Sequence, residues 1–405
     1  NEAVKIQYAA RYAGVANYYK KWQGENWGLQ KTNALLKKEA EEKEFMEWVN
    51  SNDKRKEQYG FLLDSIALLT TAREQALLVR NILREAIFSI DILSLASEYQ
   101  VIFSDTLSPQ GFIVLKEKLD KRQSSLFKNI HQKLDQTLFS TLIPYYLSET
   151  SDEFHVKALL KQINKSGSVA NLSEDIYQKG FFRDSTSAIL PENLKPARKI
   201  LRKEPSYLIA SSFDQLGNEI IIPKLIVTRQ AIDRLTAKYV KGLREMKESA
   251  FYPDANLTLR ISYGQIEGSQ PNDGMAYLPF TTAEGILEKH DPTHPDFIVP
   301  DRLIKLIENK DFGVYGENGT MPVCFLASNH TTGGNSGSPV INAHGELIGL
   351  NFDRSWESTM SDIWYDENIC RNIAVDIRYI LFIIEKFGNS QRLINEMTIV
   401  KCLKK

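Results

Sequence analysis

The chain has 405 residues, of which 42% are hydrophobic, and this length allows two or three domains with ordinary cores. Its 50 basic and 51 acidic residues give a formal net charge of −1, which offers no electrostatic basis for nucleic acid or a membrane surface as a partner. No apolar run approaches the ~20 residues of a membrane span. The three cysteines, Cys324, Cys370 and Cys402, are too few and too scattered to predict a disulfide framework or a zinc site.

The first half of the chain is predicted to be helical. It begins with Asn1 rather than Met and shows no signal peptide, so we expect a processed or truncated start. Residues 37–56 are dense in charge, which is typical of a helix with a solvated face. Over 57–99 apolar residues recur at helical spacing, with almost no Gly or Pro after Gly60. Further helices are expected over 127–138, 154–163 and 230–248.

The composition changes near residue 251. Residues 257–264 alternate apolar and polar side chains as a strand does, and Gly, Pro, Asn and Asp then become frequent, as in a β-barrel with long loops. A closing helix is expected over 375–387. The sequence therefore predicts an α+β fold. An α-helical domain covers 1–250, and an antiparallel β-barrel half with its C-terminal helix covers 251–405.

The most informative motif is Thr-Gly-Gly-Asn-Ser-Gly-Ser-Pro-Val at 332–340, which is typical of the nucleophile loop of a chymotrypsin-like serine peptidase. Flanking glycines allow a tight turn that projects the hydroxyl of Ser336, and the N–H groups of Gly334 and Ser336 are the predicted oxyanion hole. A bare Gly-x-Ser-Gly is also common in flexible turns. The proline at 339 and the predicted hairpin of 340–350 favour the nucleophile.

No base for this serine is evident. A serine nucleophile needs a base, and in chymotrypsin-like enzymes the His and Asp precede the serine and lie in a first β-barrel. None of the six histidines follows a barrel-type strand: His131, His155, His290, His294, His330 and His344. We therefore expect the first barrel, with the catalytic His and Asp, to be absent from this chain.

Several stretches resemble the bacterial dipeptidyl-peptidase 7 and 11 family. Besides 332–340, they are 345–350 with Phe352-Asp353, 252–256 with 258–260, 310–313, 361–363, 375–379 and, near the start, 11–14 with 17–20. The resemblance implies a chymotrypsin-like double barrel interrupted by a helical cap. It also implies removal of dipeptides from free N-termini without a metal or other cofactor, by periplasmic or cell-surface homodimers. Asn335 replaces the Asp that precedes the serine in trypsin-like enzymes, so activation of the trypsin type is not expected.

The resemblance also assigns roles to three further residues. An exopeptidase must hold a free α-ammonium group, which requires a carboxylate and further acceptors. Asp353 resembles the family's carboxylate for this role and Asn17 its amide partner, although both residue types are also common in exposed turns and helices. Arg354 lies at the family's S1 position, where an Arg goes with Asp or Glu at P1. The alternative is a surface Arg354 paired with Glu357 or Asp362.

Three hypotheses follow. The first is the C-terminal part of a dipeptidyl peptidase with acidic P1 preference, acting on oligopeptides with a free N-terminus and inactive without its first barrel. The second is a glutamyl-endopeptidase-like protease, which would also cut N-acetylated peptides. The third is a non-catalytic peptide-binding module that kept the fold and lost the chemistry.

Overall fold

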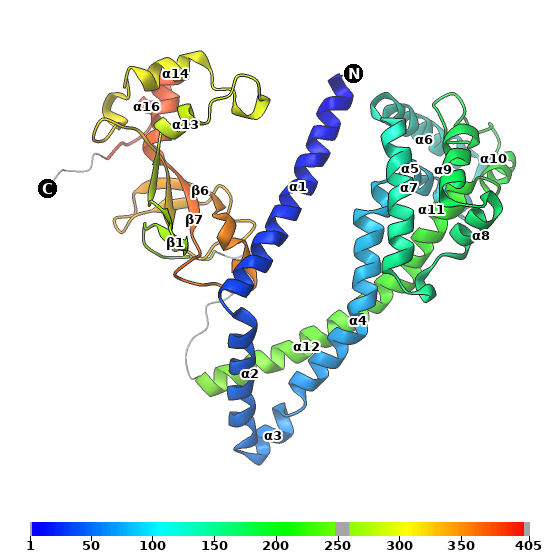
Figure 1. The fold of residues 1–405 in the computed structure, drawn as a ribbon, viewed down its shortest axis with the longest axis horizontal. Coiled ribbons are helices and arrows are strands. Elements are labelled where there is room, and N and C mark those ends of the chain that lie inside the picture. The colour runs from blue at the N-terminus through cyan, green and yellow to red at the C-terminus, as the bar shows by residue number, and fades with distance from the viewer. Residues whose placement is uncertain (1, 248–258, 401–405) are drawn as a thin grey trace. The chain divides into compact units, whose positions relative to one another are not determined.

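The computed structural model describes residues 2–247 and 259–400, which divide into two compact units (Figure 1). A helical unit consists of residues 1–12 and 42–251, and a mixed unit consists of 13–41 and 252–405. Helix α1 (Glu2–Lys31) and helix α2 (Ala34–Asn50) each contribute residues to both units. The predicted boundary between 250 and 251 lies outside the described residues, and the extents of the two domains remain predictions.

The helical unit is built from a series of helices whose bounds are α3 (Asp53–Tyr59), α4 (Leu62–Glu85), α5 (Asp91–Glu98), α6 (Pro109–Asn129), α7 (Gln132–Glu149), α8 (Lys157–Ser166), α9 (Val169–Lys179), α10 (Leu194–Leu201), α11 (Pro205–Gln215) and α12 (Ile222–Lys247). The apolar stripes of α4, α5, α7, α9 and α11 form one continuous core. The ranges predicted from the sequence correspond to α4, α5, α7, α8 and α12, whereas α6, α9, α10 and α11 were predicted only as part of a helical half. One difference is a break at 130–131, where the His131 ring nitrogen Nδ1 accepts from the Leu134 N–H and begins α7.

Two buried carboxylates organise the centre of this unit. Asp135 of α7 accepts the N–H groups of Asp91 and Ile92, at 2.6 and 3.1 Å, and so caps the N-terminus of α5. Asp91 in turn pairs with Arg11 of α1. Burial raises the pKa of Asp135 to about 6. The first residues of α1 are therefore tied to the helical core by polar contacts.

The mixed unit contains a five-stranded antiparallel sheet in the order β3-β4-β7-β6-β5. The strands are β3 (Phe280–Thr282), β4 (Pro322–Ala327), β5 (Pro339–Ile341), β6 (Leu347–Arg354) and β7 (Asn372–Asp376), with a separate hairpin of β1 (Ser269–Asn272) and β2 (Met275–Tyr277). Helices α13 (Glu284–Glu288), α14 (Asp301–Glu308), α15 (Ile377–Phe382) and α16 (Gln391–Asn395) complete the unit. Its apolar core is formed by side chains such as Ile307, Phe312 and Phe382.

Two predictions for this unit need correction. Residues 259–264 do not form a strand: in the described part of the chain this segment lies along the loop after β4, through bonds of Arg260 and Ser262 to the His330 carbonyl. Leu259 is 94% exposed, so the alternation there does not mark a buried face. The closing helix begins at Ile377, because the residues before it belong to β7. The predicted hairpin at 340–350 is confirmed by the antiparallel pairing of β5 with β6.

The part of α1 in the mixed unit packs on the turn Trp356–Asp362 through two glycines. A Cβ on Gly24 would lie 2.4 Å from Thr359 Oγ1, and one on Gly28 would lie 2.5 Å from Met360 Sδ. The Trp356 Nε1–H also donates to the Lys20 carbonyl at 2.9 Å. Only glycine allows so close an approach. Side chains of α1 at 20–25 are thereby brought beside the end of β6.

Candidate active site

Ser336 lies on an exposed turn just before β5. Gly334 and Gly337 have φ angles of +103° and +82°, a region that favours glycine. The turn is closed by Asn335 N–H donating to the Thr332 carbonyl at 3.2 Å and by Ser338 N–H donating to the Asn335 carbonyl at 3.0 Å. The glycine pattern in the sequence therefore corresponds to a real conformational requirement, and the hydroxyl of Ser336 projects from a tight turn.

Asn351 of β6 fastens this turn to the sheet. Its backbone accepts from Gly337 N–H at 2.7 Å and donates to the Ser338 carbonyl at 2.9 Å. Its buried side chain donates to the Asn335 carbonyl at 3.2 Å and accepts from Asn372 Nδ2 at 2.9 Å. These bonds hold the chain on both sides of Ser336. Sequence reasoning missed Asn351; its only signal was a polar residue among apolar ones in a predicted strand.

A β-bulge in β6 lies directly after Asn351. Asn351 pairs with Ala374 and Asp353 with Ile373, so Phe352 is the extra residue. The Phe352 carbonyl accepts a long contact of 3.5 Å from the Ser336 hydroxyl. Because a bulge changes the direction of the side chains that follow, it sets the positions of Asp353 and Arg354 beside the nucleophile turn.

The N–H groups of Gly334 and Ser336 donate to no protein acceptor within the described residues. Nor does any histidine there bond to the Ser336 hydroxyl. His155 contacts the Thr150 carbonyl, His290 the Val299 N–H, and His330 Nε2 the Ser361 carbonyl at 2.9 Å. Over 2–247 and 259–400 the structure thus presents a serine and two available N–H donors, and no histidine bonded to that serine.

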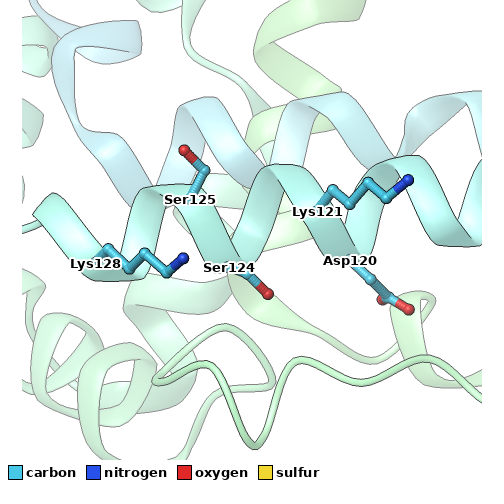
Figure 2. A pocket seen from close by; sticks show the side chains of 5 residues that line it. All are labelled: Asp120, Lys121, Ser124, Ser125 and Lys128. Atoms are coloured by element: carbon cyan, nitrogen blue, oxygen red, sulfur yellow. The ribbon is translucent and has the colours of Figure 1, made fainter.

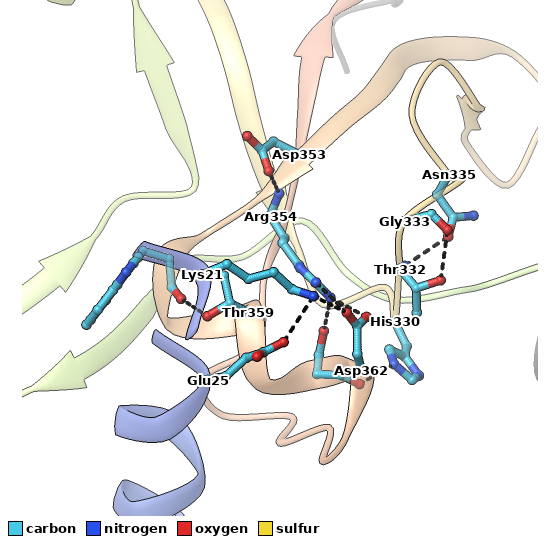
Figure 3. A network of polar contacts seen from close by, with 12 residues as sticks. Lys21, Glu25, His330, Thr332, Gly333, Asn335, Asp353, Arg354, Thr359 and Asp362 are labelled. Carbon is cyan, nitrogen blue, oxygen red and sulfur yellow. Dashed lines mark hydrogen bonds and ion pairs between the residues drawn. The ribbon is translucent and has the colours of Figure 1, made fainter. Parts of the chain in front are cut away.

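Arg354 is the centre of a polar network (Figure 3). Its Nη1 and Nη2 bond both carboxylate oxygens of Asp362, at 2.6 and 2.7 Å, and Nη1 also donates to Ser361 Oγ at 2.9 Å. Lys21 of α1 lies 3.5 Å from Asp362 and 3.1 Å from Glu25. The Arg354 side chain is only 14% exposed. Hydrogen bonding to Arg354 is the main reason why the pKa of Asp362 lies below its ordinary value.

Asp353 and Asn17, the residues predicted to hold the substrate's N-terminus, are both exposed. The Asp353 carboxylate accepts the Arg354 N–H at 2.8 Å, and in Figure 3 it points away from the Arg354 guanidinium. No hydrogen bond joins Asp353 to Asn17 among the residues described. The carboxylate therefore remains accessible to a cation.

Metal binding, a reactive cysteine and the hollow on α6 have less support as functional sites than the Ser336 turn. No group of three His, Cys, Asp or Glu side chains in the described residues could hold a metal ion. Burial raises the pKa of the thiols of Cys324 and Cys370, which disfavours reactive thiolates, and Cys402 lies outside the described residues. A polar hollow on α6 is lined by Asp120, Lys121, Ser124, Ser125 and Lys128 (Figure 2); it contains neither a His nor a Cys.

Within 2–247 and 259–400, no single helix is long and apolar enough to cross a membrane; the segments 53–89 and 91–103, which are sharply bent against each other, pass that test only as a pair.

Comparison with known proteins shows the family of this chain. The family model described as Peptidase S46 matches residues 1–399. The chain belongs to the peptidase S46 family. It is 41% identical over 412 residues to the Asp/Glu-specific dipeptidyl-peptidase of Flavobacterium psychrophilum, covering 100% of this chain and 57% of that protein. It is 37% identical to the dipeptidyl-peptidase 7 of Phocaeicola vulgatus, covering 99% of this chain and 56% of the relative.

Solved structures of this S46 group are similar as well. A crystal structure of Porphyromonas endodontalis DPP11 superposes with a TM-score of 0.85 at 32% identity, covering 98% of this chain and 57% of that one. The same enzyme in complex with the dipeptide Arg-Glu gives a TM-score of 0.83. The chain therefore spans just over half the length of the relatives it matches.

Proposed function

We propose that this chain is the nucleophile-bearing part of a serine dipeptidyl peptidase that releases N-terminal dipeptides with Asp or Glu at the second position. The observation that carries the proposal is that the exposed, glycine-flanked Ser336 lies on a turn anchored by β6, and that this strand ends at the partly buried Arg354. Relatives named Asp/Glu-specific dipeptidyl-peptidases, and the complexes of P. endodontalis DPP11 with Arg-Glu and Arg-Asp, support it.

In this proposal the Ser336 hydroxyl attacks the backbone carbonyl carbon of the second residue of the substrate, and the bond from that carbon to the third residue breaks. The N–H groups of Gly334 and Ser336 stabilise the oxyanion, the shortened peptide leaves, and water hydrolyses the acyl-enzyme. The antiparallel sheet is the second half of a chymotrypsin-like double barrel. The catalytic His and Asp come from a first barrel, which we place in the part of the relatives without a counterpart here. This chain alone is then inactive.

The register of cleavage follows from the substrate's N-terminus. We propose that the exposed Asp353 carboxylate binds the α-ammonium, with the Asn17 amide of α1 as a further acceptor. An endopeptidase has no such requirement, so cleavage of N-acetylated peptides would favour the glutamyl-endopeptidase alternative. No turnover by a complete enzyme would favour a non-catalytic peptide-binding module. By resemblance, the complete enzyme is a periplasmic or cell-surface homodimer.

The P1 preference is assigned to Arg354. A guanidinium stays charged and matches a carboxylate in a planar, bidentate pair. Of the two surface partners considered for it, Glu357 instead accepts from the Tyr277 hydroxyl at 2.8 Å, whereas Asp362 does pair with Arg354. Arg354 therefore already has one carboxylate partner, Asp362, and both residues must be considered in the P1 specificity.

The test is Ser336→Ala in the complete enzyme, assayed with a dipeptidyl chromogenic substrate with Asp at P1. Activity should fall by several orders of magnitude while the melting temperature stays nearly unchanged. Ser338→Ala is the matched control, because its side chain makes no hydrogen bond in the described residues and its loss should leave turnover within about twofold. Retained activity in Ser336→Ala would show that another residue is the nucleophile.

A further inference from the structure

The hydrogen bonds of Arg354 leave one edge of its guanidinium available. A guanidinium has five N–H donors: one on Nε and two on each terminal nitrogen. Asp362 takes one from Nη1 and one from Nη2, and Ser361 Oγ takes the other from Nη1. Among the residues described, no acceptor faces Nε or the second Nη2–H. These two hydrogens lie on the same side edge, which matches a second carboxylate.

A residue from another element adds positive charge beside this edge. Two carboxylates on one cation repel each other, so a P1 carboxylate beside Asp362 needs further positive charge nearby. Lys21, on the segment of α1 that packs in this unit, lies 3.5 Å from Asp362 Oδ2 and 3.1 Å from Glu25. The two positive charges of Arg354 and Lys21 face two resident carboxylates, Asp362 and Glu25, so a P1 carboxylate adds one negative charge. The charge of Lys21 reduces the repulsion between that carboxylate and Asp362.

We propose that Asp362 and Lys21 set the strength of the acidic P1 preference. Asp362 is the resident countercharge on one edge of Arg354, the P1 carboxylate binds the other edge, and Lys21 allows both carboxylates to share the guanidinium. This inference rests on the proposed function of Arg354 as the S1 residue.

The direction of each substitution follows from charge. Lys21→Met removes the positive charge beside Asp362 and should weaken acidic substrates, whereas apolar P1 substrates do not use it. Asp362→Asn removes the carboxylate that repels an acidic P1 group. It also leaves Arg354 without a full countercharge when an apolar P1 residue is bound. Both consequences of Asp362→Asn raise the ratio of acidic to apolar cleavage.

The experiment compares kcat/KM for dipeptidyl substrates with Asp or Leu at P1 in the complete enzyme. Lys21→Met should lower the Asp-to-Leu ratio by about tenfold, mainly through KM. Asp362→Asn should raise the ratio by about tenfold. Each factor is the effect expected from one unit charge that is partly screened by solvent. Lys20→Met is the control, because it removes the same charge from an exposed neighbouring position and should leave the ratio within twofold. Binding of Arg-Asp and Arg-Leu to the Ser336→Ala enzyme, measured by calorimetry, should follow the same order.

The inference fails if Asp362→Asn leaves the ratio unchanged or lowers it, or if Lys20→Met has the same effect as Lys21→Met. Arg354→Gly separates this failure from that of the proposed function. If Arg354→Gly abolishes acidic preference while the Asp362 and Lys21 variants do not change it, Arg354 is the S1 residue and its neighbours do not tune it. If Arg354→Gly also has no effect, the S1 assignment itself is wrong.

Discussion

Asn351 offers a test of how the nucleophile turn is held. Its side chain makes two hydrogen bonds, to the Asn335 carbonyl at 3.2 Å and from Asn372 Nδ2 at 2.9 Å, in a buried position. Asn351→Ala removes both bonds, which leaves the buried Asn372 Nδ2 without a partner among the described residues and the Asn335 carbonyl with only the Ser338 N–H. At about 1–3 kcal/mol for the buried group left unpaired and about 1 kcal/mol for the second lost bond, we expect a loss of roughly 2–4 kcal/mol in the stability of the mixed unit.

The catalytic effect should exceed the effect on binding. The lost bond to Asn335 adjoins Ser336 directly, and a displacement of about 1 Å in a catalytic group can cost on the order of a hundredfold in rate. We expect Asn351→Ala to lower kcat by about that factor with KM within about threefold. Asn351→Asp is the sharper variant, since it keeps an acceptor for Asn372 but replaces the donor that faces the Asn335 carbonyl.

The assay is kcat and KM on an Asp-P1 dipeptidyl substrate, together with the melting temperature. Asn342→Ala is the matched control: Asn342 Oδ1 accepts the N–H groups of His344 and Glu346 in the β5–β6 turn, at 2.9 and 3.0 Å. It should lower stability without lowering kcat in the folded enzyme. The reasoning is refuted if folded Asn351→Asp retains the wild-type kcat, or if Asn342→Ala lowers kcat equally.

Three further predictions address the substrate's N-terminus, pH and packing. Asp353→Ala in the complete enzyme should remove most activity on peptides with a free N-terminus, because their α-ammonium group loses its countercharge. Efficient cleavage of N-acetylated peptides by the unmutated enzyme would contradict this role of Asp353. The pKa of Asp362 is lowered chiefly by its hydrogen bonds to Arg354, so the stabilisation is present above the unfolded value of about 3.9 and is lost as pH falls through the lower folded value. The melting-temperature difference between wild type and Asp362→Asn should therefore be constant at neutral pH and become smaller as pH falls below the unfolded value; a difference that grows in acid would contradict the sign. Gly28→Val should destabilise the mixed unit by more than about 2 kcal/mol, since its Cβ would meet Met360; denaturant unfolding that shows no change would place α1 elsewhere.

Turns and hairpins depend on local backbone geometry, and local patterns in the sequence predicted them. Two apolar runs on either side of the turn at 342–345 predicted the hairpin, and the glycines at 334 and 337 occupy positions that need a positive φ. Pairings between distant residues were not predictable in the same way. Nothing in local spacing indicates that Asn372 supports Asn351, or that Lys21 lies beside Asp362, because folding rather than sequence proximity brings them together.

The alternation of apolar and polar residues at 259–264 predicted a strand that does not form there. Residues 259–264 have the pattern of a strand, yet Ile261 is 81% exposed and pairs with no neighbouring strand in the described chain. Residues 13–41 form a compact unit with the C-terminal residues, a grouping that the helical pattern of the first 250 residues does not indicate. Gly24 and Gly28 permit the contact of α1 with Thr359 and Met360, but a glycine in the sequence does not show which residues it will contact.

The central claim is that Arg354, beside the Ser336 turn, selects an acidic P1 residue. The most direct test is kcat/KM for matched peptides with Asp, Glu or Leu at the second position, in the complete enzyme and in Arg354→Gly. We expect a strong preference for Asp and Glu in the unmutated enzyme, and a loss of at least about a hundredfold for those substrates in Arg354→Gly with Leu unchanged or improved. An unchanged Asp-to-Leu ratio in Arg354→Gly would contradict the account.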